Sequence, residues 1–315
     1  MEDLETGLVY NAASSPELMA YDGNYQNEQA ISPLFQQHLE SVAATVERAM
    51  GKAQLVEVGC GKGHFLEMLL NKGFNVTGFD PSYEGKNPKV RRQYFAPDVV
   101  VQADGVILRH VLERIQNPIG FLEQIKAANG GSGKIYIEVP CFDWICEHRA
   151  WFDIFYEHAN YFRLADFSRI FVKVIDSGKI FGDQYLYVIA ELSTLRVPAI
   201  DMNSRIVFPS NFSINFFEDK IKKQGRTVIW GGCSKGVIFN LLRSRAGCHV
   251  DTVIDINPAK QGKYLPGTGL QVQSPTLGIA DLEIDTTIYV MNSNYLEEIR
   301  QMSKYRFNYI AIDHE

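Results

Sequence analysis

The sequence predicts an α/β protein made of two successive domains, each with its own parallel sheet. Through the first two-thirds of the chain, short β-branched runs alternate with helical stretches, which is typical of crossover units on a parallel sheet. Pro198 and Pro209 then interrupt a stretch without periodicity, and a second cycle of strand, glycine-rich turn and helix follows. The chain of 315 residues also exceeds the usual size of one hydrophobic core.

The composition is that of a soluble globular protein, with 46% hydrophobic and 22% charged residues. A net charge of -6 argues against a nucleic-acid binder, since such proteins neutralise phosphates with basic residues. No apolar run approaches the roughly 20 residues that span a bilayer, and no secretory signal pattern is visible. The five cysteines fit poorly with a disulfide framework because their number is odd. We therefore expect a cytoplasmic protein with thiols, a small-molecule partner, and no nucleic-acid or membrane partner.

The first domain is expected to hold a sheet with helices on both faces and an antiparallel hairpin at its end. Residues 32–50 place apolar side chains at helical spacing, which predicts a helix packed over the sheet. Strands are expected at 55–58, 75–79, 105–108 and 134–139, with a helix at 166–171 before a hairpin of 172–180 and 184–192.

The second domain is expected to be a smaller Rossmann-like unit. Its predicted elements are strands at 227–230, 253–256, 287–291 and 309–312, with a helix at 237–244 after the first. We divide the chain into an N-terminal strap and helix at 1–50, a nucleotide-binding domain at 51–197 and a C-terminal domain at 198–315.

A glycine-rich turn marks the first candidate site. Gly59, Gly61 and Gly63 stand between an apolar strand and a helix, where glycines let the backbone approach a ligand and the helix presents unpaired N–H groups. Asp80 ends the next strand, twenty-one residues after Gly59, where a carboxylate can accept hydrogen bonds from ribose hydroxyls. The alternative is that the glycines only turn the chain and Asp80 only caps a helix.

The segment L-V-E-V-G-C-G-K-G differs from the usual dinucleotide fingerprint and resembles motif I of the class I S-adenosylmethionine methyltransferases. The resemblance continues through F-D-P-S, A-D-G-V-I-L-R-H-V-L-E-R-I-Q-N-P and G-K-I-Y-I-E-V-P, and covers roughly residues 54–140. It implies that S-adenosyl-L-methionine is the cofactor and that His110, after the fourth strand, faces it. The residues implied to bind the cofactor are Glu57, Gly59, Cys60, Gly61, Gly63, Asp80, Pro81 and His110.

Aromatic and ionisable residues are concentrated in the stretch that follows the fifth strand, C-F-D-W-I-C-E-H-R-A-W-F-D-I-F-Y-E-H-A-N-Y-F. Loops at this edge of an open α/β sheet form the binding crevice. We expect His158 to be a catalytic base, Glu157 to orient it, and Tyr156, Tyr161 or His110 to stabilise an enolate oxygen. The alternative is an aromatic lid with a surface Glu–His pair. The cysteines and histidines lack paired C-x-x-C spacing, so no metal site is expected.

Three stretches resemble, more narrowly, the sugar C-methyltransferases that act on nucleotide-linked 4-keto-deoxysugars: F-D-I-F-Y-E-H-A-N-Y-F, G-G-C-S-K-G-V-I-F-N and D-I-N-P-A-K-Q-G-K-Y-L-P-G-T-G. This resemblance implies carbon methylation beside a carbonyl and an N-terminal strap, with Tyr21 and Tyr25, over the active site. Members usually begin with a small zinc module that runs into a G-L-V-Y-N-like segment. Here T-G-L-V-Y-N stands almost at the start, so we expect that module to be missing. Arg114 also stands where relatives commonly have a histidine.

The C-terminal domain carries a second glycine-rich turn, W-G-G-C-S-K-G, which suits a phosphate or another anion. Asp255 ends the next strand, as Asp80 does in the first domain. We expect the acceptor's nucleotide or phosphate to bind here, through Gly232, Lys235, Gly236, Asp255 and Lys263. The alternative is a packing domain whose glycines only turn the chain.

Two other functions fit the same cofactor fold, because the fold fixes the methyl donor and not the acceptor. One is an O- or N-methyltransferase of another small molecule. The other is a non-catalytic protein that binds S-adenosylmethionine or a nucleotide.

Overall fold

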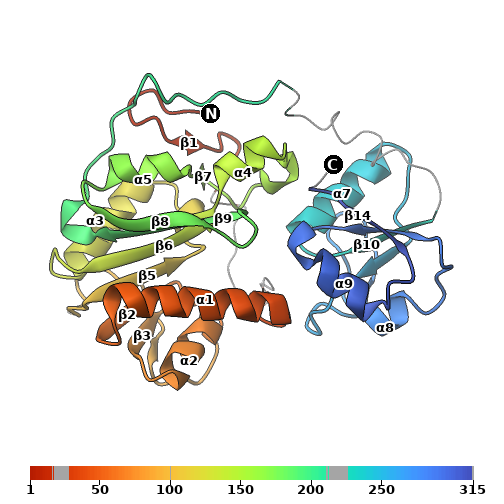
Figure 1. Cartoon of the computed structure of the whole chain (residues 1–315), viewed down its shortest axis with the longest axis horizontal. Helices are drawn as coiled ribbons and strands as arrows, with labels where there is room; N and C mark the ends of the chain where they lie inside the picture. The colour runs from red at the N-terminus through yellow and green to blue at the C-terminus, as the bar shows by residue number, and fades with distance from the viewer. Residues whose placement is uncertain (16, 18–27, 100, 211, 213–225, 314–315) are drawn as a thin grey trace. The chain divides into compact units, whose positions relative to one another are not determined.

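The computed structural model describes residues 1–15, 17, 28–99, 101–210, 212 and 226–313. The chain forms two compact units, shown in Figure 1. Unit 1 comprises Met1–Tyr25, Gln37–Trp144 and Tyr156–Val207, and unit 2 comprises Gln26–Gln36, Ile145–Phe155 and Phe208–Glu315. The three-part domain division made from the sequence stays a prediction.

Unit 1 is built on a seven-stranded sheet in the order β4-β3-β2-β5-β6-β9-β8. The strands from β4 to β6 are parallel, whereas β9 runs antiparallel to both β6 and β8. The bounds are β2 Gln54–Val58, β3 Asn75–Phe79, β4 Val90–Arg91, β5 Gly105–Arg109, β6 Lys134–Pro140, β8 Val174–Ile180 and β9 Tyr185–Glu191. Central strands β2, β5 and β6 are buried almost throughout, as expected for a sheet covered on both faces.

Helices connect and flank these strands. The long helix α1 (Pro33–Met50) begins after Ser32, whose hydroxyl accepts a hydrogen bond from Phe35 N at 3.2 Å. One face of α1 is buried through Phe35, Leu39, Val42, Ala43, Val46 and Met50, which matches the predicted amphipathic pattern. The other α-helices are α2 (His64–Asn71) beside β3, α3 (Pro118–Ala128), α4 (Phe142–Glu147) and α5 (Leu164–Ile170) beside β8 and β9.

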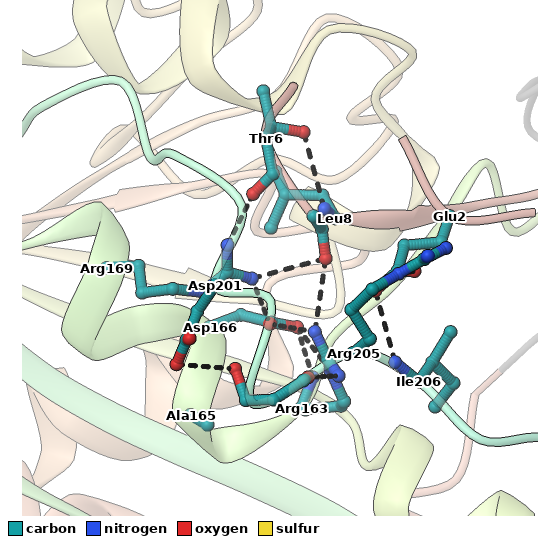
Figure 2. A network of polar contacts seen from close by, with 12 residues as sticks. Glu2, Thr6, Leu8, Arg163, Ala165, Asp166, Arg169, Asp201, Arg205 and Ile206 are labelled. Atoms are coloured by element: carbon teal, nitrogen blue, oxygen red, sulfur yellow. Dashed lines mark hydrogen bonds and ion pairs between the residues drawn. The ribbon is translucent and has the colours of Figure 1, made fainter. Parts of the chain in front are cut away.

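A small second sheet and a polar network hold the first ten residues in unit 1. β1 (Val9–Tyr10) pairs antiparallel with β7 (Asn160–Tyr161). In the network of Figure 2, the buried Asp166 accepts hydrogen bonds from Arg163 and Arg169. Arg163 in turn donates to Gly7 O at 3.1 Å and Ser204 O at 2.7 Å, so it joins the N-terminal segment to the segment after β9.

Unit 2 contains a five-stranded, wholly parallel sheet in the order β12-β11-β10-β13-β14. Its strands are β10 Thr227–Trp230, β11 Thr252–Ile254, β12 Val272–Gln273, β13 Thr287–Val290 and β14 Asn308–Ala311, and its helices include α7 (Ser234–Arg245), α8 (Pro275–Gly278) and α9 (Leu296–Met302). Buried Val228, Ile254, Ile288 and Val290 form its core with Trp230 and Phe307. Both sheets confirm the predicted fold class.

Candidate active site

The glycine-rich turn of unit 1 joins β2 to α2. Gly59, Gly61 and Gly63 all have left-handed backbone angles, with φ of 72, 54 and 83°. A Cβ on Gly59 would lie 2.4 Å from Cγ2 of Val111, whereas a Cβ on Gly61 would meet no atom within 4 Å. Gly59 is therefore needed for packing, and Gly61 keeps one side of the turn open to a ligand.

Asp80 follows β3 and is held by this turn. Its Oδ2 accepts a hydrogen bond from Gly61 N at 2.8 Å, and its Oδ1 accepts from the backbone N and the hydroxyl of Ser82 at 2.8 and 2.7 Å. A carboxylate offers about four acceptor positions, so three bonds leave room for a ligand hydroxyl. The structure thus fixes the orientation of Asp80 without using its full capacity. Pro81, predicted beside it, is exposed.

Glu57 lies at the end of β2, buried at 3% exposure, and its Oε2 has no hydrogen-bond partner among the described residues. Burial raises the pKa of Glu57 from 4.5 to about 7, against the opposing charge of Arg109 and with a smaller contribution from Asp80. Burial likewise raises the pKa of the Cys60 thiol. A buried polar atom left open beside a glycine turn fits a cofactor that carries hydrogen-bond donors.

His110, which directly follows β5, lies against the carboxylate of Glu138 on β6. The Nε2 of His110 is 3.1 Å from Glu138 Oε1, and its backbone has a left-handed φ of 53°. Its ring meets Tyr185 edge-on with centroids 4.5 Å apart. The side chain of His110 is 23% exposed, so one part of the ring remains accessible.

The segment with the predicted catalytic residues is anchored on the turn that follows His110. Ala159 N donates to Glu113 O at 2.7 Å, and the Asn160 amide donates to Ile115 O at 2.5 Å. The carboxylate of Glu157 accepts a hydrogen bond from Arg114 Nη1 at 2.6 Å. Arg114 therefore forms an ion pair with the residue predicted to orient His158.

His158 and Tyr161 are both buried, and their rings meet at an angle with centroids 6.1 Å apart. Tyr161 also packs on Phe142 at 5.3 Å. Tyr156, by contrast, is 48% exposed. Glu157, His158 and Tyr161 are thus shielded from solvent and Arg114 largely so, which strengthens the electrostatic interaction between Arg114 and Glu157.

The N-terminal segment also lies in this region. The resemblance implied an N-terminal strap over the active site, but not the residues that the strap contacts. Asn11 N donates to Ala159 O at 2.9 Å, and the Ser14 hydroxyl donates to Tyr156 O at 3.2 Å. Together with the β1–β7 pairing, these bonds place residues 9–14 along residues 156–161. The predicted strap residues Tyr21 and Tyr25 lie outside the described residues.

The second glycine-rich turn, in unit 2, has a related geometry. Gly232 N donates to Asp255 Oδ2 at 2.8 Å, and a Cβ on Gly236 would lie 2.0 Å from Gly231 O, which explains the glycine there. The Lys235 ammonium pairs with Asp153 at 3.0 Å.

Two further lysines of unit 2 follow the second strand of this sheet. Lys260 pairs with Asp255 at 3.3 Å and contacts the sulfur of Cys233, whereas Lys263 is exposed. The structure therefore brings Gly232, Asp255 and Lys260 together, and Lys235 meets a carboxylate of its own unit.

Residues 27–174 match a family model described as a methyltransferase domain, a region slightly short of half of the chain. No curated protein sequence matches significantly. The fold is similar to that of several solved structures. A SAM-dependent methyltransferase from Archaeoglobus fulgidus shares 18% identity, with 50% of this chain and 98% of that chain covered and a TM-score of 0.36.

A putative S-adenosylmethionine-dependent methyltransferase from Listeria monocytogenes shares 11% identity, with coverages of 50% and 98% and a TM-score of 0.39. The 1,6-didemethyltoxoflavin-N1-methyltransferase from Burkholderia thailandensis, solved with bound 1,6-didemethyltoxoflavin and S-adenosylhomocysteine, shares 16% identity, with coverages of 52% and 79% and a TM-score of 0.37. At this level of likeness, none of the three bears on the acceptor.

The matching family model identifies residues 27–174 as a methyltransferase domain, and the glycine turn with Asp80 lies within this region. The chain is a methyltransferase enzyme, and its cofactor is S-adenosylmethionine. In the part of the chain that the structure describes, no helix has the length and apolarity needed to cross a membrane. The same residues contain no group of three or more His, Cys, Asp or Glu side chains arranged to hold a metal ion.

Proposed function

We propose that this enzyme methylates a carbon beside the carbonyl of a nucleotide-linked keto-deoxysugar in the cytoplasm. The observation that carries the proposal is the buried segment with Glu157 and His158, which the Arg114–Glu157 ion pair and backbone hydrogen bonds hold on the turn after His110. Carbon methylation needs a base, because a C–H bond must break before the new C–C bond forms. The motif resemblance to the sugar C-methyltransferases supports the choice of acceptor.

When bound, S-adenosylmethionine supplies an electrophilic methyl group on a sulfonium. In the proposed reaction, the imidazole of His158 accepts the α-proton, and the electrons of the C–H bond move into an enolate. Tyr161 or Tyr156 donates a hydrogen bond to the enolate oxygen. The enolate carbon would then bond to the methyl carbon while the bond from that carbon to the sulfonium breaks and its electron pair stays on sulfur, and His158 would release the proton to solvent.

Arg114 has a structural part in this proposal. Its ion pair with Glu157, at 2.6 Å and largely buried, fixes the backbone that carries His158. Positioning of this kind can supply a large share of a rate enhancement, since the methyl donor is already reactive.

The acceptor's phosphate is proposed to bind at the turn of Lys235 in unit 2. Burial raises the pKa of Asp153, although the Lys235 ammonium at 3.0 Å lowers it in part. A carboxylate that is costly to keep ionised is readily replaced by a phosphate, which is a stronger partner for an ammonium.

The test is incubation with nucleotide-linked 4-keto-deoxysugars and S-adenosylmethionine in D₂O. We expect a mass gain of one methyl group on carbon, together with deuterium exchange at the α-carbon before methylation. His158→Ala should reduce turnover by roughly 10²–10⁴ and abolish this exchange, with cofactor affinity unchanged.

Exchange at the wild-type rate in His158→Ala would assign the base to another residue, with His110 or Tyr156 next in line. Methylation of a hydroxyl or an amine, with no exchange of carbon-bound hydrogen, would replace the proposal by an O- or N-methyltransferase.

A further inference from the structure

Glu138 is the centre of a buried polar network in unit 1. Its side chain has no exposed surface, and its Oε1 lies 2.8 Å from His38 Nε2, 3.1 Å from His110 Nε2 and 3.2 Å from Arg109 Nη2. Its Oε2 accepts from Arg109 Nε at 3.0 Å and from the Tyr136 hydroxyl at 3.1 Å. Each oxygen thus has at least two partners.

The charge of Glu138 follows from these partners. Burial alone would raise the pKa of Glu138, but the charge of Arg109 and the hydrogen bonds of His110 and His38 outweigh burial and hold this pKa well below its usual range. Glu138 is therefore an ionised carboxylate, which accepts hydrogen bonds and donates none.

The opposite edge of the His110 ring faces a second carboxyl group in a contrasting environment. His110 Nδ1 is 3.8 Å from Glu113 Oε1, and Arg114 Nε is also 3.8 Å from that oxygen. Glu113 is 1% exposed, and neither of its carboxyl oxygens has a hydrogen-bond partner among the described residues. Burial raises the pKa of Glu113, while His110 and Arg114 lower it in part.

The ring of His110 therefore lies between a carboxylate held ionised and a carboxyl whose ionisation is disfavoured. When the pKa of one carboxyl group is lowered and that of the other is raised, the first is held as the base form and the second as the acid form. A neutral imidazole has one N–H and one lone pair, and the hydrogen bond at one nitrogen determines which nitrogen carries the proton.

We propose that Glu138 is a positioning residue that fixes neutral His110 as its Nε2–H tautomer and leaves Nδ1 as the only nitrogen of this ring that can accept a proton. In this tautomer the ring has no N–H to offer to a substrate oxygen. Enolate stabilisation, which rests on the proposed carbon methylation, then falls to Tyr156 or Tyr161, and His110 serves as a proton acceptor toward Glu113.

The test is a long-range ¹H–¹⁵N spectrum of the full-length protein labelled with ¹⁵N in its histidine rings, recorded without cofactor at a pH where His110 is neutral. His110→Asn assigns the signals. We expect the Nε2–H pattern for His110 in the wild type and a mixed or reversed pattern in Glu138→Gln, because an amide can also donate. Glu113→Gln is the matched control and should keep the Nε2–H pattern.

Kinetics provide a second measurement. Glu138→Gln should lower kcat by roughly 10- to 100-fold with little change in cofactor affinity, and Glu138→Asp should recover part of the loss because it keeps the charge. An Nδ1–H pattern in the wild type would overturn the proposal even if Glu138→Gln fails to fold, and so would an unchanged pattern in a folded Glu138→Gln. Neither result depends on which atom of the acceptor is methylated, so failure here is separate from failure of the proposed function.

Discussion

Each of the two units has a glycine-rich turn that is held by an aspartate in the same way. The charged side chains around the two aspartates differ. In unit 1, Asp80 accepts from Gly61 N and Ser82 N, each at 2.8 Å. In unit 2, Asp255 accepts from Gly232 N and from Asn257 N two residues later, also at 2.8 Å. In both units a carboxylate after the second strand locks the glycine turn after the first.

The difference lies in the third neighbour. Asp255 has the ammonium of Lys260 at 3.3 Å, whereas no cation pairs with Asp80 among the described residues, and the buried carboxyl nearby is Glu57. Each aspartate accepts three hydrogen bonds, but the third donor is the neutral Ser82 hydroxyl for Asp80 and an ammonium for Asp255, so only the charge of Asp255 is balanced by a cation. A shared backbone geometry is therefore insufficient evidence for a shared ligand, and we expect ribose binding in unit 1 only.

Removing Lys260 should have the largest effect on stability. Lys260→Met leaves the buried Asp255 charge without its counterion, and loss of one partner of a buried pair costs about 3–5 kcal/mol. Urea denaturation measures the change, with Lys263→Met as the exposed control. The double variant Lys260→Met/Asp255→Asn should recover part of the loss, because the amide removes the uncompensated charge but keeps only one acceptor oxygen for Gly232 N and Asn257 N. Wild-type stability in Lys260→Met would mean that the ion pair does not distinguish the two sites.

Glu57 predicts a pH dependence that unit 2 lacks at the corresponding position. Its pKa is raised from 4.5 to about 7, so the folded protein holds this proton more tightly than the unfolded chain does. Stability should therefore fall as the pH rises between these values, by about 3 kcal/mol in total. Glu57→Gln should remove this component from denaturation curves measured at pH 5 and 8, while the exposed Glu67→Gln should not. Parallel curves for wild type and Glu57→Gln would contradict the assignment.

The two aspartates should differ in cofactor binding. Asp80→Ala removes an acceptor from the predicted cofactor site and should weaken S-adenosylmethionine binding by about 1–3 kcal/mol, or roughly 5- to 150-fold. Asp255→Ala should leave this affinity unchanged. Isothermal titration calorimetry measures both. Equal losses of affinity in the two variants would contradict the expectation that only Asp80 binds the cofactor.

The smallest expected effect concerns Lys235. Lys235→Ala should raise the acceptor's KM about fivefold, or ~1 kcal/mol. The effect is small because acceptor binding only replaces one anionic partner of Lys235, the Asp153 carboxylate, with another, the phosphate. Asp153→Asn is the matched variant and should change the KM in the opposite direction. Steady-state kinetics at saturating cofactor measure both. An unchanged KM in Lys235→Ala would place the acceptor's phosphate elsewhere.

The longer strands of both sheets could be predicted from the sequence because their signals are local, whereas the two-residue edge strands β4 and β12 were not predicted. Runs such as Leu55 to Val58 are buried on both faces and need no knowledge of distant residues. The turns could be located too, since a left-handed backbone requires glycine at Gly59 and Gly63. The resemblance to class I methyltransferases covered the same region.

The polar networks could not be predicted in this way, because their members come from distant parts of the chain. The sequence singles out His110, but neither its partner Glu138 nor His38, the second histidine on Glu138. The available signal was a glutamate within the apolar run of β6, where burial of a charge demands partners. Likewise, the sequence does not distinguish Lys260 from the other lysines of its loop, and only the fold shows that it contacts Asp255.

The polar network at the start of the chain has a consequence for folding during synthesis. Val9 pairs with Tyr161, and Glu2 bonds to Arg205, 203 positions further along the chain. Such contacts close very long loops and form late, since loop-closure entropy opposes them until the intervening sheet exists. On the ribosome, β1 emerges long before its partner strand and would then be among the last segments to dock. A nascent chain that ends before Asn160 would still expose β1 without its partner strand β7.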